Sequence, residues 1–168
     1  VCATVTTVAS DTWGDERLLA EMLYIEQPQS LRAAQQLTSF YARDRNPPGA
    51  LAVIRQSKER MPDRDVFHFM QTLIECSFYF DSVDSFDGLI ELAKDAEYER
   101  YVLDIVTQFR LQIGTGCDGK LTEARFVKLI RNLIDNPNYN RRTRTLAFLY
   151  AQLAKIEIRR GNPSKAYE

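Results

Sequence analysis

The sequence predicts an all-α protein: an α-solenoid of antiparallel helical hairpins whose repeats are partly degenerate. Three observations lead to this prediction. Apolar residues recur at the i, i+3, i+4 spacing of amphipathic helices through most of the chain after residue 10. Turn signals made of Pro, Gly, Asn and Asp separate these segments at short intervals. No segment after residue 10 has the alternating pattern of a strand, and short connections favour antiparallel neighbouring helices.

Bulk composition excludes several classes of protein. The 168-residue chain is long enough for one domain with a substantial core. It is 45% hydrophobic and 27% charged, with a formal net charge of −1, so its charge does not favour nucleic acid as a partner. The cysteines, Cys2, Cys76 and Cys117, form no CxxC pair, and with one histidine they do not suggest a zinc site. One disulfide is compatible with this set but is not required, so the redox compartment stays open.

The first 14 residues form an apolar leader. Two interpretations stay open: a loose leader or short strand, and the outer end of a transmembrane helix that is cut short. The leader has no basic residue of the kind that begins a signal peptide. No stretch of the chain reaches the roughly 18 apolar residues of a membrane span. Residues 15–168 are expected to form a single helical repeat domain, truncated at its C-terminal end.

Three helices are expected in the first third of the chain. Asp15 and Glu16 begin the first, because acidic residues in a first turn favour a helix start, and Pro28 ends it. Ser30 caps the second, and the Pro- and Gly-containing turn 45–49 precedes the third. The expected apolar faces are Leu18, Leu19, Met22, Leu23 and Ile25 in the first helix, Leu31, Ala34, Leu37, Phe40 and Tyr41 in the second, and Ala50, Leu51, Ile54 and Met61 in the third.

Two further hairpins and part of a third are expected after Pro62. A very apolar helix, 66–78, is followed by an acidic turn, 81–87, and a returning helix. The next hairpin has the Gly-rich loop 114–119 between its helices, with Thr122 beginning the second of them. A final helix is expected from about Arg141 to Arg160. Its expected packing face carries Tyr150, Leu153 and Ala154, and a further helix would begin after the cap Ser164.

Motifs for chemistry are weak. The Asp87-Gly88 and Asp118-Gly119 pairs resemble parts of calcium loops, but Lys94 and Arg125 stand where each loop would need its final carboxylate. His68, the only histidine, is expected to be structural, because no nucleophile with an orienting acid lies nearby in sequence. No phosphate-binding glycine loop occurs. We therefore expect no catalytic residue, cofactor or metal within this chain.

Two regions of opposite charge stand out, an acidic one over residues 81–99 and a basic one over residues 125–144. Two interpretations stay open. They are either two solvated helix faces or a polar concave surface that binds a partner's peptide or a charged glycan. The basic residues are Arg125, Lys128, Arg131, Arg141, Arg142 and Arg144, and the acidic residues are Asp81, Asp84, Asp87, Glu91, Asp95, Glu97 and Glu99.

Both ends of the helical region resemble the tetratricopeptide family, whose helical hairpins repeat about every 34 residues. The last unit matches at Tyr150, Leu153, Ala154, Gly161 and Ala166, and the first at Leu37, Tyr41, Ala50, Ile54 and Pro62. The middle units depart from the pattern around 81–88 and 114–119, and Glu157 stands where the family usually has an aromatic residue. The resemblance implies binding of a protein or peptide in a concave groove, without catalysis.

The opening of the chain carries a second resemblance. Thr12-Trp13-Gly14-Asp15, a helix, Pro28 and then Ser30-Leu31-Arg32-Ala33 lead into the first repeat. This order is similar to the extracytoplasmic tetratricopeptide tails of bacterial polytopic membrane glycosyltransferases and O-antigen ligases. It implies a periplasmic accessory domain, joined to the membrane only through a missing N-terminal region. Cys76 and Cys117 would then meet oxidants. A cytoplasmic location is the alternative.

The function expected from the sequence is therefore that of a non-catalytic interaction scaffold that binds a partner protein or peptide. The alternative is a soluble accessory domain of a membrane-bound glycosyltransferase or polysaccharide polymerase or ligase, whose catalytic part lies outside this chain. The oligomeric state stays open. The residues expected to contact the partner are Tyr41, His68, Tyr150, Arg125, Lys128 and Arg131.

Overall fold

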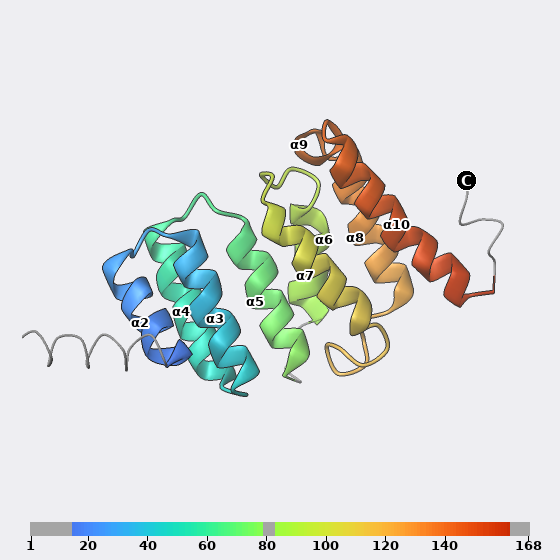
Figure 1. The fold of residues 1–168 in the computed structure, drawn as a ribbon. Helices are drawn as coiled ribbons and strands as arrows, with labels where there is room; N and C mark the ends of the chain where they lie inside the picture. Colours follow the sequence, from blue (N-terminus) through green and yellow to red (C-terminus); the bar gives the residue numbers. More distant parts are fainter. Residues whose placement is uncertain (1–14, 79–82, 162–168) are drawn as a thin grey trace, which may run out of the picture. The chain divides into compact units, whose positions relative to one another are not determined.

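A computed structural model describes residues 15–78 and 83–161 (Figure 1). Every regular element in these ranges is a helix, which confirms the predicted all-α class. The helices are α2 (Glu16–Glu26), α3 (Leu31–Arg43), α4 (Pro47–Arg60), α5 (Val66–Ser77), α6 (Val83–Leu92), α7 (Arg100–Leu111), α8 (Glu123–Asp135), α9 (Pro137–Asn140) and α10 (Thr143–Arg159). None of the helices in the described ranges is long and apolar enough to cross a membrane. The predicted leader 1–14 and the helix after Ser164 lie outside the described residues.

The chain divides into two compact units, Val1–Asp63 and Arg64–Glu168. The first unit contains α2, α3 and α4, and α3 packs against both of the others. In the second unit α5 packs against α7, α6 packs against α8, and α5 also contacts α6. The last long helix, α10, packs against α7, α8 and α9.

Polar caps set the starts of the helices in the first unit. The Asp15 carboxylate accepts hydrogen bonds from the backbone N–H groups of Arg17 and Leu18 at 2.9 and 3.1 Å. The side chains of Ser30 and Asn46 cap α3 and α4 in the same way. Pro47 opens α4, where its missing N–H would have no partner inside the helix. The predicted starts of the first two helices are therefore confirmed.

The buried face of α2 differs from the predicted one. Ala20 and Tyr24 are buried, whereas Leu18 and Ile25 are 45% and 76% exposed. Both buried positions lie on the helix face turned toward α3 and α4. The small side chain of Ala20 allows a close approach, and the hydroxyl of Tyr24 finds polar partners on α4, including Ser57. Apolar character alone therefore misplaced the packing face of this helix.

Two elements of the second unit also differ from the prediction. Helix α6 begins at Val83, inside the stretch 81–87 that was expected to be an acidic turn. Asp84 lies in its first turn, where a carboxylate interacts favourably with the helix dipole. A short helix, α9, begins at Pro137, between the expected helices, where no helix was predicted.

The packing face of α10 is offset by about one residue from the predicted face. Leu149, Gln152 and Ile156 are buried, whereas Tyr150 is 55% exposed. Gln152 belongs to this buried face because its side-chain oxygen accepts a hydrogen bond from Arg110 on α7 at 2.9 Å. Because Gln152 is polar, the apolar pattern of the sequence does not mark it as a buried residue.

Buried polar groups fasten α6 to the turn between α8 and α9. The Asn136 side chain, 1% exposed, donates to the carbonyl oxygens of Ala93 and Ala96 at 3.0 and 2.9 Å. Its own oxygen accepts from the backbone N–H of Asn138 at 2.7 Å and so caps α9. The buried Tyr139 hydroxyl donates to the Glu97 carbonyl at 3.2 Å. This cluster supplies hydrogen-bond donors to three carbonyl groups of the segment that follows α6.

A disulfide joins Cys76, near the end of α5, to Cys117 in the loop after α7. The backbone N–H of Cys117 also donates to the Cys76 carbonyl at 2.9 Å, so a covalent bond and a hydrogen bond both join these two segments. Cys117 and Asp118 adopt positive φ angles of 51° and 56°. Neighbouring Gly114 and Gly119 also have positive φ, which glycine adopts without steric cost. The loop is therefore a tight, covalently fastened turn.

Candidate binding groove

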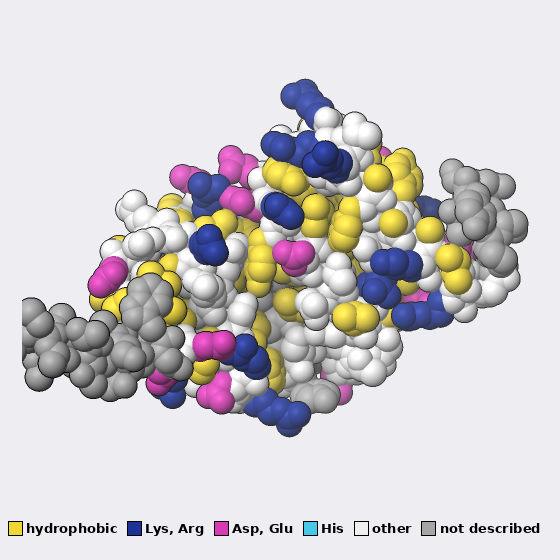
Figure 2. Space-filling view, viewed as in Figure 1, with side chains coloured by type: hydrophobic (Ala, Val, Ile, Leu, Met, Phe, Trp, Pro, Cys, Tyr) yellow, Lys and Arg dark blue, Asp and Glu magenta, His cyan; other side chains and the backbone are white. Residues whose placement is uncertain are grey.

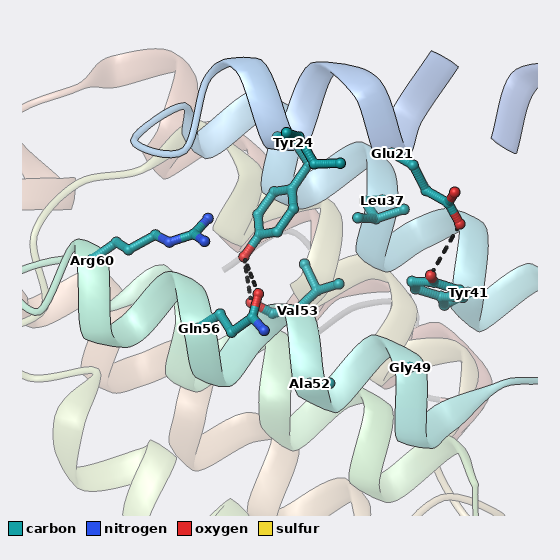
Figure 3. A pocket seen from close by; sticks show the side chains of 10 residues that line it. Glu21, Tyr24, Leu37, Tyr41, Gly49, Ala52, Val53, Gln56 and Arg60 are labelled. Atoms are coloured by element: carbon teal, nitrogen blue, oxygen red, sulfur yellow. Dashed lines mark hydrogen bonds between the residues drawn. The ribbon is translucent and has the colours of Figure 1, made fainter. Parts of the chain in front are cut away.

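A groove of about 430 Å³ lies in the first unit, between α2 and α4 and over α3 (Figure 3). This volume is within the range typical of ligand sites. Figure 3 shows Arg60 at one end, Glu21 and Tyr41 at the other, and Tyr24 with Val53 between them. The lining residues are Glu21, Tyr24 and Ile25 from α2, Leu37 and Tyr41 from α3, and Gly49, Ala52, Val53, Gln56 and Arg60 from α4.

The spacing of residues along α4 explains why this space is open. Gly49, the adjacent pair Ala52 and Val53, Gln56 and Arg60 follow one another at intervals of three or four, so they share one helix face. Gly49 and Ala52 are the smallest on that face and leave room above α3. A Cβ atom added at Gly49 would lie 3.0 Å from the Tyr41 ring and 2.8 Å from the Asn46 side chain. Glycine therefore allows the tyrosine to close that end of the groove.

The middle of the groove is apolar with one fixed hydroxyl. Tyr24 is 6% exposed, and its hydroxyl lies 3.3 Å from the carbonyl oxygen of Val53 and 3.2 Å from the hydroxyl of Ser57. These contacts hold the ring against α4. Leu37 and Val53, both buried, supply apolar surface beside it. An aliphatic or aromatic side chain that enters the groove would bury its apolar surface against these residues, which favours binding.

The end of the groove at Glu21 is a satisfied polar cluster. Tyr41 donates its hydroxyl proton to a Glu21 oxygen at 3.2 Å, and the Arg17 side chain donates to the same oxygen at 2.9 Å. Burial, followed by the nearby Glu21 charge, raises the pKa of the Tyr41 hydroxyl. Tyr41 therefore remains a protonated donor at neutral pH. The Glu21 carboxylate is held in place and neutralised by Arg17.

The end of the groove at Arg60 is different in character. The guanidinium lies 5.1 Å from the centroid of the Tyr24 ring, in a cation–π contact. Within the described ranges no carboxylate forms an ion pair with Arg60, which lies at the last residue of α4. The groove therefore has one end where the charges are already paired and one end with an exposed cation.

The three aromatic candidates from the sequence do not share one site. Tyr41 lines the groove. His68 is exposed on α5, and Tyr150 is exposed on α10, both in the second unit. Figure 2 shows hydrophobic side chains reaching the surface along α10, with Lys and Arg side chains gathered near them. Among the residues of that unit that the structure describes, the exposed large hydrophobic ones are Leu111, Tyr150 and Ile158.

The predicted acidic and basic regions face each other on neighbouring helices. Arg125 of α8 pairs with Asp87 of α6 at 3.0 Å, and Lys128 pairs with Glu91 at 3.4 Å. The hydrogen bond that Arg125 donates to Asp87 is the main cause that raises the pKa of Arg125, and a hydrogen bond from Lys94 is the main cause that lowers the pKa of Glu91. Two of the three basic candidates are thus engaged within the unit, and the third, Arg131, is exposed on α8.

Tyr24, Gln56 and Arg60 were missed as site residues by the sequence reasoning. The available signal was the run of small and polar residues on one face of the third helix, from Gly49 through Ala52 and Gln56. That face lacks the large apolar residues that would bury it against another helix. The described ranges contain no cluster of three or more potential metal ligands from His, Cys, Asp and Glu. No protein family, curated protein or solved structure matches this chain.

Proposed function

We propose that this chain is a non-catalytic interaction domain that binds a segment of a partner polypeptide in the groove between α2 and α4. The observation that carries the proposal is the groove itself: an apolar trough of about 430 Å³ with polar groups at its two ends. Tyr24 and Tyr41 provide rigid aromatic walls, and such residues contribute much of the binding energy at protein interfaces. Glu21 and Arg60 supply the orienting charges.

The order of helix packing supports a repeat architecture of tetratricopeptide type as part of this proposal. In the second unit α5 and α7 pack together, as do their returning partners α6 and α8. Helices two positions apart along the chain therefore become neighbours, which is how hairpins stack into two layers. The first unit has the same feature at its groove, where α2 and α4 flank α3. Stacked hairpins present open grooves to partners.

The Cys76–Cys117 disulfide favours the second candidate, an extracytoplasmic accessory domain of a membrane-bound glycosyltransferase or polysaccharide ligase. Disulfides persist in oxidising compartments and are uncommon in the cytosol. Both cysteines are 1% exposed, so the bond serves structure. This candidate also uses the groove for a partner polypeptide, and it differs from the first in location and in what precedes residue 1.

The test of the proposal is selection from a random peptide library displayed on phage, with the full chain as the bait. Ala52 is exposed on the groove face of α4, so Ala52→Phe fills the groove with little effect on the core. Ala124→Phe makes the same change at an exposed position of α8 and serves as the matched control. We expect selected peptides to bind Ala52→Phe at least about tenfold more weakly than wild type, a loss of about 1.4 kcal/mol.

The control variant should bind the same peptides with unchanged affinity. Circular dichroism should show equal helix content in both variants, which separates loss of binding from loss of folding. Peptides that bind wild type and Ala52→Phe equally well would place the binding surface elsewhere. A selection that enriches no peptide above background would contradict a peptide-binding function for the groove.

A further inference from the structure

We infer that the groove selects a segment with an acidic side chain, and that Arg60 holds this carboxylate while an apolar neighbour fills the space beside Tyr24. This inference rests on the proposed function and names the chemistry of the partner. It follows from the difference between the two ends of the groove. One end presents an exposed guanidinium and the other presents a carboxylate.

Arg60 is prepared to receive a carboxylate. Its guanidinium carbon lies 5.1 Å from the centroid of the Tyr24 ring, in a cation–π contact that uses none of its N–H groups as a hydrogen-bond donor to a carboxylate. The N–H donors project in the plane of the guanidinium and remain able to form a two-point contact with a carboxylate. Tyr24 is itself fixed by its contacts with Val53 and Ser57. An arginine that rests on a rigid ring loses less conformational entropy on binding than a freely moving one.

The opposite end disfavours an acidic group. Glu21 already accepts hydrogen bonds from Tyr41 and Arg17, and Arg17 is not among the residues that line the groove, so a second carboxylate inside the groove at this end would meet the Glu21 charge with no lining cation of its own. The acidic residue of the partner is therefore directed to Arg60. The polarity of the two ends thus sets the direction in which the segment lies.

The length of the groove sets the size of the segment. Gly49, below Tyr41, and Arg60 are eleven positions apart on α4, which corresponds to about 16 Å along a helix axis. An extended segment of about five residues spans that distance. The acidic residue then lies near one end of the segment. Its apolar partner lies near the middle, against Leu37 and Val53.

The experiment compares matched peptides from the library selection on wild-type protein and on Arg60→Gln. Each acidic residue of a selected peptide is replaced by its amide, and fluorescence anisotropy of a labelled peptide gives the affinity. We expect one acid-to-amide change to weaken binding to wild type about tenfold or more. The same change should matter little for Arg60→Gln, because the contact is already absent. Arg60→Glu should bind a peptide with lysine at that position better than wild type does.

Other outcomes would overturn the inference in distinguishable ways. If acid-to-amide changes have no effect while Ala52→Phe still abolishes binding, the acidic preference is wrong and the groove function stands. If amidation of the peptide's C-terminus weakens binding and the side-chain changes do not, Arg60 binds the C-terminal carboxylate of the peptide. If binding of a peptide without tryptophan shifts the emission of Trp13, and Ala52→Phe produces the same shift alone, the chain's own residues 1–14 are the occupant. If no peptide depends on Ala52, both proposals fail.

Discussion

At the scale of single residues, Asn136 is a buried polar side chain that joins separate segments of the second unit. It makes three hydrogen bonds that link the chain after α6 to the turn between α8 and α9. Asn136→Ala removes all three and leaves the carbonyl oxygens of Ala93 and Ala96 without this donor. We expect a loss of about 2–4 kcal/mol in the free energy of unfolding, measured by urea denaturation.

Asn138→Ala is the matched control for that change. Asn138 reaches the same Ala96 carbonyl at 3.2 Å, but its side chain is exposed, so water replaces the bond. Its loss should stay below about 1 kcal/mol. Equal effects of the two substitutions would show that burial of Asn136 is not what makes its hydrogen bonds important.

The buried hydroxyl of Tyr139 should make the free energy of unfolding depend on pH in the alkaline range. Burial is the main cause that raises the pKa of its hydroxyl above the ordinary value of 10.0. The unfolded state therefore loses this proton first, and the folded state loses stability as the pH rises above about 10, by up to about 1.4 kcal/mol per pH unit. Urea unfolding between pH 8 and about pH 11 measures this slope.

Tyr139→Phe supplies the control for the alkaline effect. It removes the titrating proton together with the hydrogen bond to Glu97, so it lowers stability at neutral pH and flattens the alkaline slope. Every other ionisable side chain is the same in the two proteins, so the difference between the two slopes reports on Tyr139. Identical slopes for wild type and Tyr139→Phe would mean that Tyr139 titrates normally.

At the scale of elements, the disulfide predicts a clear response to reduction. Cys76 and Cys117 close a loop with a sequence separation of 41, which includes α6 and α7. Replacing both with alanine should lower the free energy of unfolding by about 2–4 kcal/mol, mainly because the unfolded chain gains freedom. Thermal unfolding with and without dithiothreitol measures this effect.

Thiol counting provides the control for the disulfide. The chain has three cysteines, so in denaturant one thiol should react with iodoacetamide when no reductant has been added, and all three should react after reduction. Cys2→Ser should leave the sensitivity to dithiothreitol unchanged. Three reactive thiols in the denatured, unreduced protein would contradict the bond.

Most elements of the fold were predictable from the sequence, but their packing faces were less so. Caps such as Asp15 and Ser30 act locally, so they could be found from neighbouring residues alone. The buried face of α10 depends on a contact between Gln152 and Arg110, which are far apart in sequence. The start of α6 was misread because Asp84 suits both a turn and a first helical turn.

The groove was also only partly predictable. Tyr41 was expected to contact a partner and it lines the groove, whereas Arg60 carried no signal in the sequence before its contact with Tyr24 was visible. Charge runs were misleading in a different way. The sequence shows charges in order along the chain, but it does not show that Asp87 and Arg125 meet across two helices.

At the scale of the whole molecule, the division into two units predicts two separate regions of stability. The boundary falls at Asp63, in a connection as short as those inside each unit, so the sequence offered no linker to mark it. Ile54 is 1% exposed in the first unit, and Leu133 is fully buried in the second. Ile54→Ala and Leu133→Ala should each destabilise their own unit by about 2–5 kcal/mol.

Amide hydrogen exchange followed by mass spectrometry distinguishes the units. In Ile54→Ala faster exchange should be confined to peptides before Asp63, and in Leu133→Ala to peptides after it. Each variant serves as the control for the other. Faster exchange spread evenly over the chain in both variants would show that the units unfold as one.

The disulfide also determines how the chain would transmit mechanical force. When the two ends are pulled apart, tension passes through the bond between Cys76 and Cys117 and bypasses the chain between them. With a sequence separation of 41, the bond keeps about 140 Å of contour length from extending. The oxidised molecule therefore extends less before it becomes taut. A reductant acting on the stretched chain would release this hidden length in a single step.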